Sequence, residues 1–276
     1  MSMPQTDTQV SWLKPFTESE ITSVLLARAK GKQHLSLGSI VVDLGDGRFV
    51  KSSHRTEELL TEAMAMDFIR THTTIPVPQV HRFFMHGLIA FIVMDAIPGW
   101  TLLKVSHKLS PQACQNVAQQ LYKIVTELGS LDDSSSRKNL YGQWPDKSFA
   151  TSRRFAQNQN IPTFSSFDDL LSYIIPAGES RELSLDVSCT RPVLTHGDLS
   201  SNNIMVDLDG NILAILDWEM FGWYPAFWDR MMLLRTASYR AKRVYDAFEG
   251  AFGAFEPEME RLAKFVVDLA EPLFLD

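Results

Sequence analysis

The most informative chemistry in the sequence lies in one short stretch around His196-Gly197-Asp198. Asn203 follows five positions after Asp198, and Asp217 comes at the end of a later short apolar run. A carboxylate on a tight loop, an amide and a carboxylate at a strand end can converge from three short segments. Phosphoryl transfer uses a base or orienter for the attacking hydroxyl, and oxygen ligands that hold Mg²⁺ against nucleotide phosphates. The spacing therefore indicates phosphoryl transfer.

The same stretch resembles the signature of aminoglycoside phosphotransferases and the related choline kinases. The matching residues are His196-Gly197-Asp198 with Asn203, then Leu216-Asp217-Trp218-Glu219, and the resemblance continues to Asp229. Four earlier segments match in the family's order: Phe49-Val50-Lys51, Thr61-Glu62-Ala63, Thr74 to Pro78 and Ile92 to Gly99. An isolated His-Gly-Asp tripeptide is usually only a turn, so the ordered set carries the resemblance.

The resemblance implies a role for each matched residue of the later stretch. Asp198 would be the catalytic aspartate that accepts or orients the proton of the acceptor hydroxyl. Asn203 and Asp217 would bind Mg²⁺. His196 would shape the catalytic loop, and Glu219 would brace that loop or reach a metal-bound water.

The earlier segments imply a site for the phosphoryl donor, ATP or GTP. Lys51 would contact the nucleotide phosphates, and Glu62 would hold Lys51, because a carboxylate on a helix fixes the orientation of the lysine and keeps it charged. Backbone groups of Met94, Asp95 and Ala96 would hydrogen-bond the adenine edge.

The resemblance also implies that the elements positioning these residues form an α+β, two-lobed protein-kinase-like fold. The N-lobe, residues 1–97, is expected to bind nucleotide with an antiparallel β-sheet and helices. Thr17 and Glu20 form a capping box. Gly45-Asp46-Gly47 is a hairpin turn, and Pro98-Gly99 breaks the chain. These signals predict helices at 18–30 and 56–72 and strands at 39–44, 48–51, 80–84 and 88–94.

The C-lobe, residues 98–276, is expected to be mostly helical, with short catalytic hairpins and acceptor-binding helices. Ser110-Pro111 is an N-cap and N1 pair, and the catalytic loop spans 196–203. Residues 130–166 are polar and weakly patterned, which indicates a loop with irregular helix. Apolar runs predict strands at 193–195, 204–206 and 212–216, and helices at 111–128, 228–252 and 258–274.

Composition excludes several other classes of protein. The formal charge is 26 minus 33, or −7, which repels nucleic acid and anionic lipid. The longest apolar run, Leu88 to Met94, is far short of the roughly 20 residues that a membrane helix needs, and the first residues lack a basic-then-apolar signal. Cys114 and Cys189 suggest no disulfide framework or zinc site. We expect a soluble, cytoplasmic protein without a nucleic-acid or membrane partner.

The acceptor molecule is only weakly indicated. Residues 186–276 hold 15 acidic against 8 basic side chains, whereas residues 1–100 hold 10 against 9. Such a field would draw a cationic small molecule to the second lobe. The requirement for solubility explains the acidic excess equally well.

Two other functions fit the sequence less well. A catalytically silent binding or regulatory module is suggested by the single Gly38 where kinases carry a glycine-rich loop over the phosphates. Protein kinase activity is disfavoured, because the chain has His-Gly-Asp and Asp-Trp-Glu in place of His-Arg-Asp and Asp-Phe-Gly. The aromatic run from Phe221 to Trp228 is interpreted as core packing in preference to a stacking site.

Overall fold

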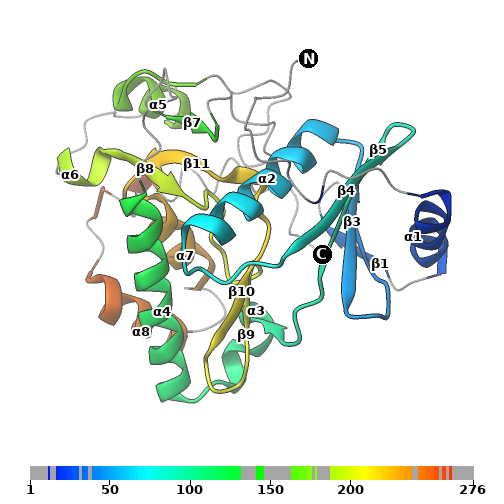
Figure 1. The fold of residues 1–276 in the computed structure, drawn as a ribbon. Helices are drawn as coiled ribbons and strands as arrows, with labels where there is room; N and C mark the ends of the chain where they lie inside the picture. The colour runs from blue at the N-terminus through cyan, green and yellow to red at the C-terminus, as the bar shows by residue number, and fades with distance from the viewer. Residues whose placement is uncertain are drawn as a thin grey trace. The chain divides into compact units, whose positions relative to one another are not determined.

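The computed structural model describes residues 12, 17–30, 33–36, 39–131, 141–145, 163–175, 178, 187–237, 242–254, 257–258 and 261–262 (Figure 1). The chain divides into two compact units. Unit 1 comprises Met1–His72 and Val77–Pro98, and unit 2 comprises Thr73–Pro76 and Gly99–Asp276. The chain thus passes into unit 2 after Pro98, and the four residues that follow the helix at 56–72 also belong to unit 2.

Unit 1 is built on a five-stranded antiparallel sheet in the order β1-β2-β3-β5-β4. The strands are β1 (Gln33–Ser36), β2 (Ser39–Asp43), β3 (Arg48–Ser53), β4 (Val80–His86) and β5 (Ile89–Asp95), and the helices are α1 (Glu18–Lys30) and α2 (Thr56–His72). These positions confirm the two helices and four strands expected in this part of the sequence. Strand β1 has no counterpart among the strands expected from the sequence.

The two faces of this sheet pack against different helices. On one face, Val24 of α1 joins a cluster of buried strand residues, Val42, Val50, Phe84, Phe91 and Val93. Side chains alternate along a strand, so Lys51, next to Val50, points to the opposite face. Helix α2 packs against β3, β4 and β5. Lys51 thus points to the face of the sheet on which α2 packs.

Unit 2 contains two small three-stranded sheets, ordered β10-β9-β6 and β7-β11-β8, and several helices. Helix α4 packs against both β8 and α8. The strands are β6 (Trp100–Thr101), β7 (Gly142–Gln143), β8 (Pro192–Thr195), β9 (Ile204–Val206), β10 (Ile212–Ile215) and β11 (Gly222–Pro225). The helices are α3 (Leu102–Val105), η2 (Ser106–Lys108), α4 (Pro111–Ser130), α5 (Phe167–Ile174), α6 (Val187–Thr190), η5 (Trp218–Met220), α7 (Trp228–Ala237) and α8 (Lys242–Phe252).

Several expectations for unit 2 are confirmed. Helix α4 has Ser110 as its N-cap, and β8, β9 and β10 lie where the apolar runs predict strands. The aromatic side chains Phe221, Trp223, Tyr224, Phe227 and Trp228 are buried, as the core interpretation requires. Cys114 and Cys189 are free.

Other expectations fall partly outside the described residues. The span 228–252 contains α7 and α8, and residues 238–241 between them are not described. Most of the helix expected at 258–274, and most of 130–166, also lies outside the described residues. Within 130–166 the structure places β7, which the sequence analysis did not predict. No helix in the described part of the chain is long and apolar enough to cross a membrane.

The tip of the β9–β10 hairpin is fastened to helix α4. Gln120 donates from Nε2 to the carbonyl of Gly210 at 2.8 Å, and its Oε1 accepts from the N–H of Ile212 at 3.0 Å. Asn116 donates to the carbonyl of Asp209 at 3.1 Å. These bonds hold the hairpin that joins Asn203 to Asp217.

Replacing Gly210 by alanine should destabilise this anchorage. Gly210 has φ +80°, and a Cβ there would lie 2.2 Å from the backbone oxygen of Ala113. Left-handed backbone costs a non-glycine residue about 1–2 kcal/mol, and the clash adds to that, so we expect a loss of about 3 kcal/mol in the free energy of unfolding. Urea unfolding measures the loss.

Gly87→Ala is the matched control for this prediction. Gly87 also has positive φ, +60°, but no atom lies within 4 Å of the position that an alanine methyl would take. The variant should therefore show only the backbone cost, about 1 kcal/mol. Equal losses in the two variants would contradict the close packing of Gly210 on α4.

Candidate active site

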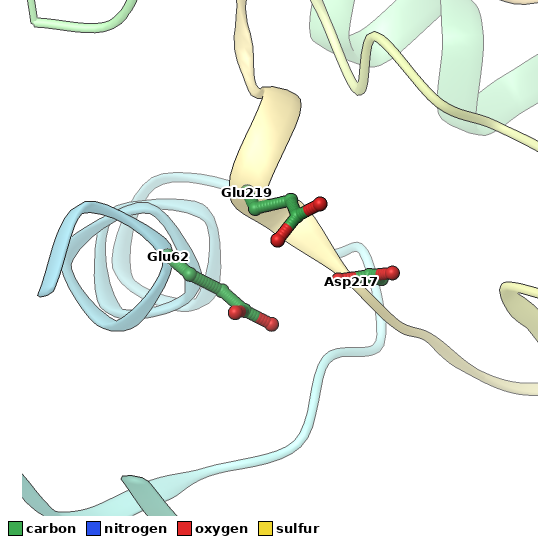
Figure 2. Close-up of side chains that lie close together, drawn as sticks. All are labelled: Glu62, Asp217 and Glu219. Carbon is green, nitrogen blue, oxygen red and sulfur yellow. The ribbon is translucent and has the colours of Figure 1, made fainter. Parts of the chain in front are cut away.

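Lys51 and Glu62 form a buried ion pair within unit 1. The ammonium lies 2.9 Å from Oε1 and 2.8 Å from Oε2 of Glu62, and both residues are no more than 5% exposed. Glu62 projects from α2 (Figure 2) and is buried, and Lys51 lies on β3. A buried charge pair with such geometry keeps the lysine charged and holds its side chain in one orientation.

In unit 2, His196 connects residues 196–203, the expected catalytic loop, to the end of β10. The N–H of Asp198 donates to Nδ1 of His196 at 3.2 Å, so the ring proton is on Nε2, which donates to the carbonyl of Leu216 at 2.9 Å. The imidazole is completely buried. His196 thus joins the backbone of Asp198 to the residue that precedes Asp217.

The register of the β9–β10 hairpin brings the expected metal ligands close in the fold. Ile204 pairs with Ile215, and the N–H of Leu216 donates to the carbonyl of Asn203 at 2.8 Å. Asn203 in turn donates from Nδ2 to the carbonyl of Asp198 at 2.9 Å. This bond fixes the orientation of the amide, whose Oδ1 is the atom that can bind a cation.

Asp217 adopts an unusual backbone conformation. Its φ and ψ are 65° and 64°, and it is the one non-glycine residue with positive φ in the described part of the chain. Such a conformation persists only where the surroundings enforce it, and it often marks a functional site. Here the neighbours of Asp217 are fixed by the bonds of Leu216 and by Trp218, whose Nε1 donates to the carbonyl of Ile215 at 3.0 Å.

The carboxylates of Asp217 and Glu219 form a donor set that fits Mg²⁺. They project from the same turn at the start of η5, and an oxygen of each lies within 4.8 Å of the other (Figure 2). Carboxylate and amide oxygens are the protein ligands that Mg²⁺ prefers. Asp217 and Glu219, with Oδ1 of Asn203, therefore provide suitable chemistry for this ion.

Asp229, in the first turn of α7, holds the backbone of the catalytic loop. Its carboxylate accepts from the N–H of His196 at 2.7 Å and from the N–H of Gly197 at 2.9 Å. Burial raises the pKa of Asp229 to about 7. The two N–H donors lower this pKa, and the negative charge of Asp198 raises it further. Trp228 Nε1 also donates to the carbonyl of Gly197 at 3.0 Å.

Gly197 itself is required by this arrangement. Its φ is +83°, and a Cβ there would lie 2.3 Å from the carbonyl oxygen of Met220. The glycine before Asp198 therefore allows the catalytic loop to lie directly against η5.

A family model decides which proteins this chain belongs with. The model of the phosphotransferase enzyme family matches residues 40–265, well over half of the 276 residues. The chain belongs to this phosphotransferase family. The match confirms the resemblance found in the sequence and the predicted class, a phosphotransferase of the small-molecule kinase type.

Solved structures of phosphotransferases share its fold. An aminoglycoside phosphotransferase of Streptomyces rimosus, in complex with ADP and streptomycin, is 16% identical and matches with a TM-score of 0.57 over 91% of this chain and 98% of its own. A thermostable mutant of another, in its apo form, is 15% identical and gives 0.61 over 92% and 89%. A third, in complex with gentamicin, is 19% identical and gives 0.55 over 91% and 87%. They confirm the predicted protein-kinase-like α+β fold.

A curated protein is also similar to this phosphotransferase-family chain. It is the clavilactone A biosynthesis cluster protein Y of Ampulloclitocybe clavipes, which is 24% identical over 219 residues. The aligned region is 64% of this chain and 53% of the relative. The chain thus spans about half the length of the curated relative that it matches.

The segment expected to hold adenine uses two of its N–H groups inside unit 1. The N–H of Asp95 donates to the carbonyl of Gln79, and the N–H of Ala96 donates to the carbonyl of Gly47. The side chain of Asp95 pairs with His81 at 2.7 Å. Carbonyl oxygens are therefore the groups that Asp95 and Ala96 could offer a nucleotide, and Met94 lies within the sheet.

Two residues of unit 2 that support this site were not assigned a role from the sequence. Asp229 ends the stretch that resembles the family, but its distance of 31 positions from Asp198 gives no hint of contact. Gln143 lies in the weakly patterned region, and its side chain donates to the carbonyl of Glu219. No local periodicity signals either contact, because both depend on tertiary packing.

Proposed function

We propose that this protein transfers the γ-phosphoryl group of ATP or GTP to a hydroxyl of a small, cationic molecule, with Mg²⁺. Asp198 would accept or orient the proton of the acceptor hydroxyl. Asn203 and Asp217 would hold Mg²⁺, with Glu219 as a further ligand or as a partner of a metal-bound water. Mg²⁺, when bound, neutralises negative charge on the phosphates.

The donor would be held by the residues of unit 1. Lys51 would contact the phosphates, and Glu62 would keep its ammonium charged and oriented. Backbone carbonyls of the segment at Met94, Asp95 and Ala96 would meet the adenine edge. The ADP in the Streptomyces rimosus structure supports a nucleotide as donor.

The observation that carries this proposal is the direct connection between Asp198 and the metal-ligand turn. His196 links the N–H of Asp198 to the carbonyl of Leu216, and Asn203 links the carbonyl of Asp198 to the N–H of Leu216. Because both the N–H and the carbonyl of Leu216 are bonded in this way, the distance between the proposed base, Asp198, and the metal ligand Asp217 would be fixed before the substrate binds. Such preorganisation supplies much of the catalysis in phosphoryl transfer.

The cationic character of the acceptor rests on charge. The surplus of seven acidic side chains in residues 186–276, 15 against 8, would attract a positively charged molecule. Streptomycin and gentamicin in two of the similar structures agree with an amine-bearing acceptor.

Asp217→Ala should abolish Mg²⁺-dependent nucleotide binding. A ligand at 100 times its Kd stabilises the folded state by about 2.7 kcal/mol, or roughly 5 °C or more in Tm for a chain of this size. We expect that rise for the unmodified protein with ATP or GTP and Mg²⁺, and its loss in the variant. Thermal unfolding with each nucleotide, with and without Mg²⁺, measures it.

Asp209→Ala is the control for Asp217→Ala. Asp209 is an exposed acidic residue at the tip of the hairpin that leads to Asp217, and its removal should leave the Mg²⁺-dependent rise intact. If the unmodified protein shows no rise with either nucleotide at millimolar concentration, the phosphotransferase proposal fails and a silent binding module becomes the better description.

A further inference from the structure

The turn from Leu216 to Phe221 carries both acidic residues of the proposed metal site, and most of its carbonyl groups accept a hydrogen bond. Buried carbonyls need donors, so each donor shows what holds the turn in place. Four of these bonds are His196 Nε2 to Leu216, Phe221 N to Trp218, Tyr224 Oη to Met220 and Trp144 N to Phe221.

The carbonyl of Glu219 is held by a side chain from a distant part of the sequence. Gln143 donates to it from Nε2, across 76 positions of the chain. Gln143 is only 3% exposed, although a glutamine is usually found at the surface. Burying a primary amide is unfavourable unless its donors are used, so the burial of Gln143 requires bonds of this kind.

The backbone of β7 fixes where the Gln143 side chain stands. Gly142 and Gln143 pair antiparallel with Trp223 and Gly222 of β11, the strand that follows the turn directly. The N–H of Trp144 donates to the carbonyl of Phe221 at 3.0 Å. The backbone of β7 and the side chain of Gln143 therefore hold the same turn at neighbouring positions.

We propose that Gln143 is a positioning residue for the Mg²⁺ site, which sets the direction of the Glu219 carboxylate relative to Asp217. The inference rests on the function proposed above. A hydrogen bond to the carbonyl of Glu219 fixes the plane of the peptide that follows it. The orientation of that plane relative to Cα is the ψ angle of Glu219. When the plane is fixed, the direction in which the Glu219 side chain leaves Cα is therefore restricted.

The chemistry of the bond explains why the residue is glutamine. An amide nitrogen donates to a carbonyl, whereas the carboxylate of a glutamate in the same place would set oxygen against oxygen. Methionine has nearly the same length but no donor. Gln143→Glu therefore turns an attraction into a repulsion, and Gln143→Met removes the bond while it keeps the volume.

The test measures how much Mg²⁺ the nucleotide-bound protein needs. Unmodified protein, Gln143→Glu, Gln143→Met and Gln115→Glu are titrated with Mg²⁺ at fixed ATP, and Tm is recorded. Gln115 is exposed on α4, so Gln115→Glu is the same chemical change away from the site. Removing a partner that orients a metal ligand typically lowers metal affinity 10- to 100-fold, so we expect half-saturation at about tenfold higher Mg²⁺ in both Gln143 variants.

The outcomes separate this inference from the proposed function. If the unmodified protein shows no Mg²⁺-dependent rise in Tm, the proposed function fails. If it shows one and both Gln143 variants half-saturate at the same Mg²⁺ as Gln115→Glu, only the positioning role fails. A fall in Mg²⁺-free nucleotide affinity equal to the fall in Mg²⁺ affinity would show general destabilisation and also overturn the inference. If Gln143→Glu does not fold, the volume-matched Gln143→Met decides.

Discussion

Asp198→Ala is expected to lower turnover by about 10²- to 10⁴-fold, the usual contribution of a positioned general acid or base. The half-buried side chain stands on a loop whose backbone is bonded to His196, Asn203 and the end of β10. Those bonds use backbone atoms of Asp198, so the variant keeps them. Nucleotide affinity with Mg²⁺ should therefore remain within a few fold of the original.

The measurement compares turnover with binding in the same preparation. Nucleotide hydrolysis or transfer to an accepted substrate gives kcat, and the Mg²⁺-dependent rise in Tm gives binding. Asp209→Ala, which removes an exposed carboxylate elsewhere on the hairpin, should change neither. Comparable kcat in Asp198→Ala and in the unmodified protein would refute the assignment of Asp198 as the catalytic aspartate.

Asp229→Asn should lower kcat by roughly 100-fold, with little change in the nucleotide KM. The carboxylate accepts from the N–H groups of both His196 and Gly197, whereas an asparagine has one oxygen and must turn its amino group toward the other N–H. The peptide before Asp198 would then rotate, and a displacement near 1 Å at a reacting group can cost about 10²-fold in rate. Steady-state kinetics of the variant measures both parameters, and Asp209→Asn is the matched control.

The same substitution should change how stability depends on pH. Burial raises the pKa of Asp229 to about 7 from its ordinary 3.8, so between about pH 4 and pH 7 the folded protein holds a proton that the unfolded chain has lost. Stability contributed by this group is therefore present at low pH and is lost as pH rises through that window. Asparagine does not titrate, so Asp229→Asn should gain stability relative to the original between pH 5 and pH 8.

Urea unfolding at the two pH values measures this difference. We expect the free energy of unfolding of Asp229→Asn, relative to the original protein, to be higher at pH 8 than at pH 5 by at least about 1 kcal/mol. No difference between the two pH values would mean that the two N–H bonds outweigh burial and keep Asp229 ionised throughout, because neither the folded nor the unfolded chain would then bind a proton in this range.

The elements with a strong local pattern were predictable from the sequence. Helix α1 was predicted from the capping box, which the structure contains as the bonds between Thr17 and Glu20. Helix α2, with its apolar residues at helical spacing, and the β9–β10 hairpin, with its Asp-Gly turn, also lie where their patterns predict. In each case the signal that indicates the element lies in residues near one another in the sequence.

Elements that depend on distant partners could not be predicted. Strand β7 has two residues and exists because β11 offers it an edge, and β6 pairs with β9 through two residues only. A strand so short has no periodicity to detect. The burial of Gln143 and Asp229 has the same origin, since a polar residue is buried only where the fold supplies its hydrogen-bond partners.

The residue types of the candidate site, their order and the chemistry that they suit could be read from the amino-acid sequence. These follow from the side chains themselves, because a carboxylate or an amide has the same donors and acceptors wherever it stands. The resemblance already implied that His196 shapes the catalytic loop, but its bonds to Asp198 and Leu216 are seen only in the folded chain. The same holds for Asp229 under that loop and for Gln143 on the carbonyl of Glu219. Hydrogen bonds between residues so far apart in the chain depend on the tertiary packing that holds their backbones close together.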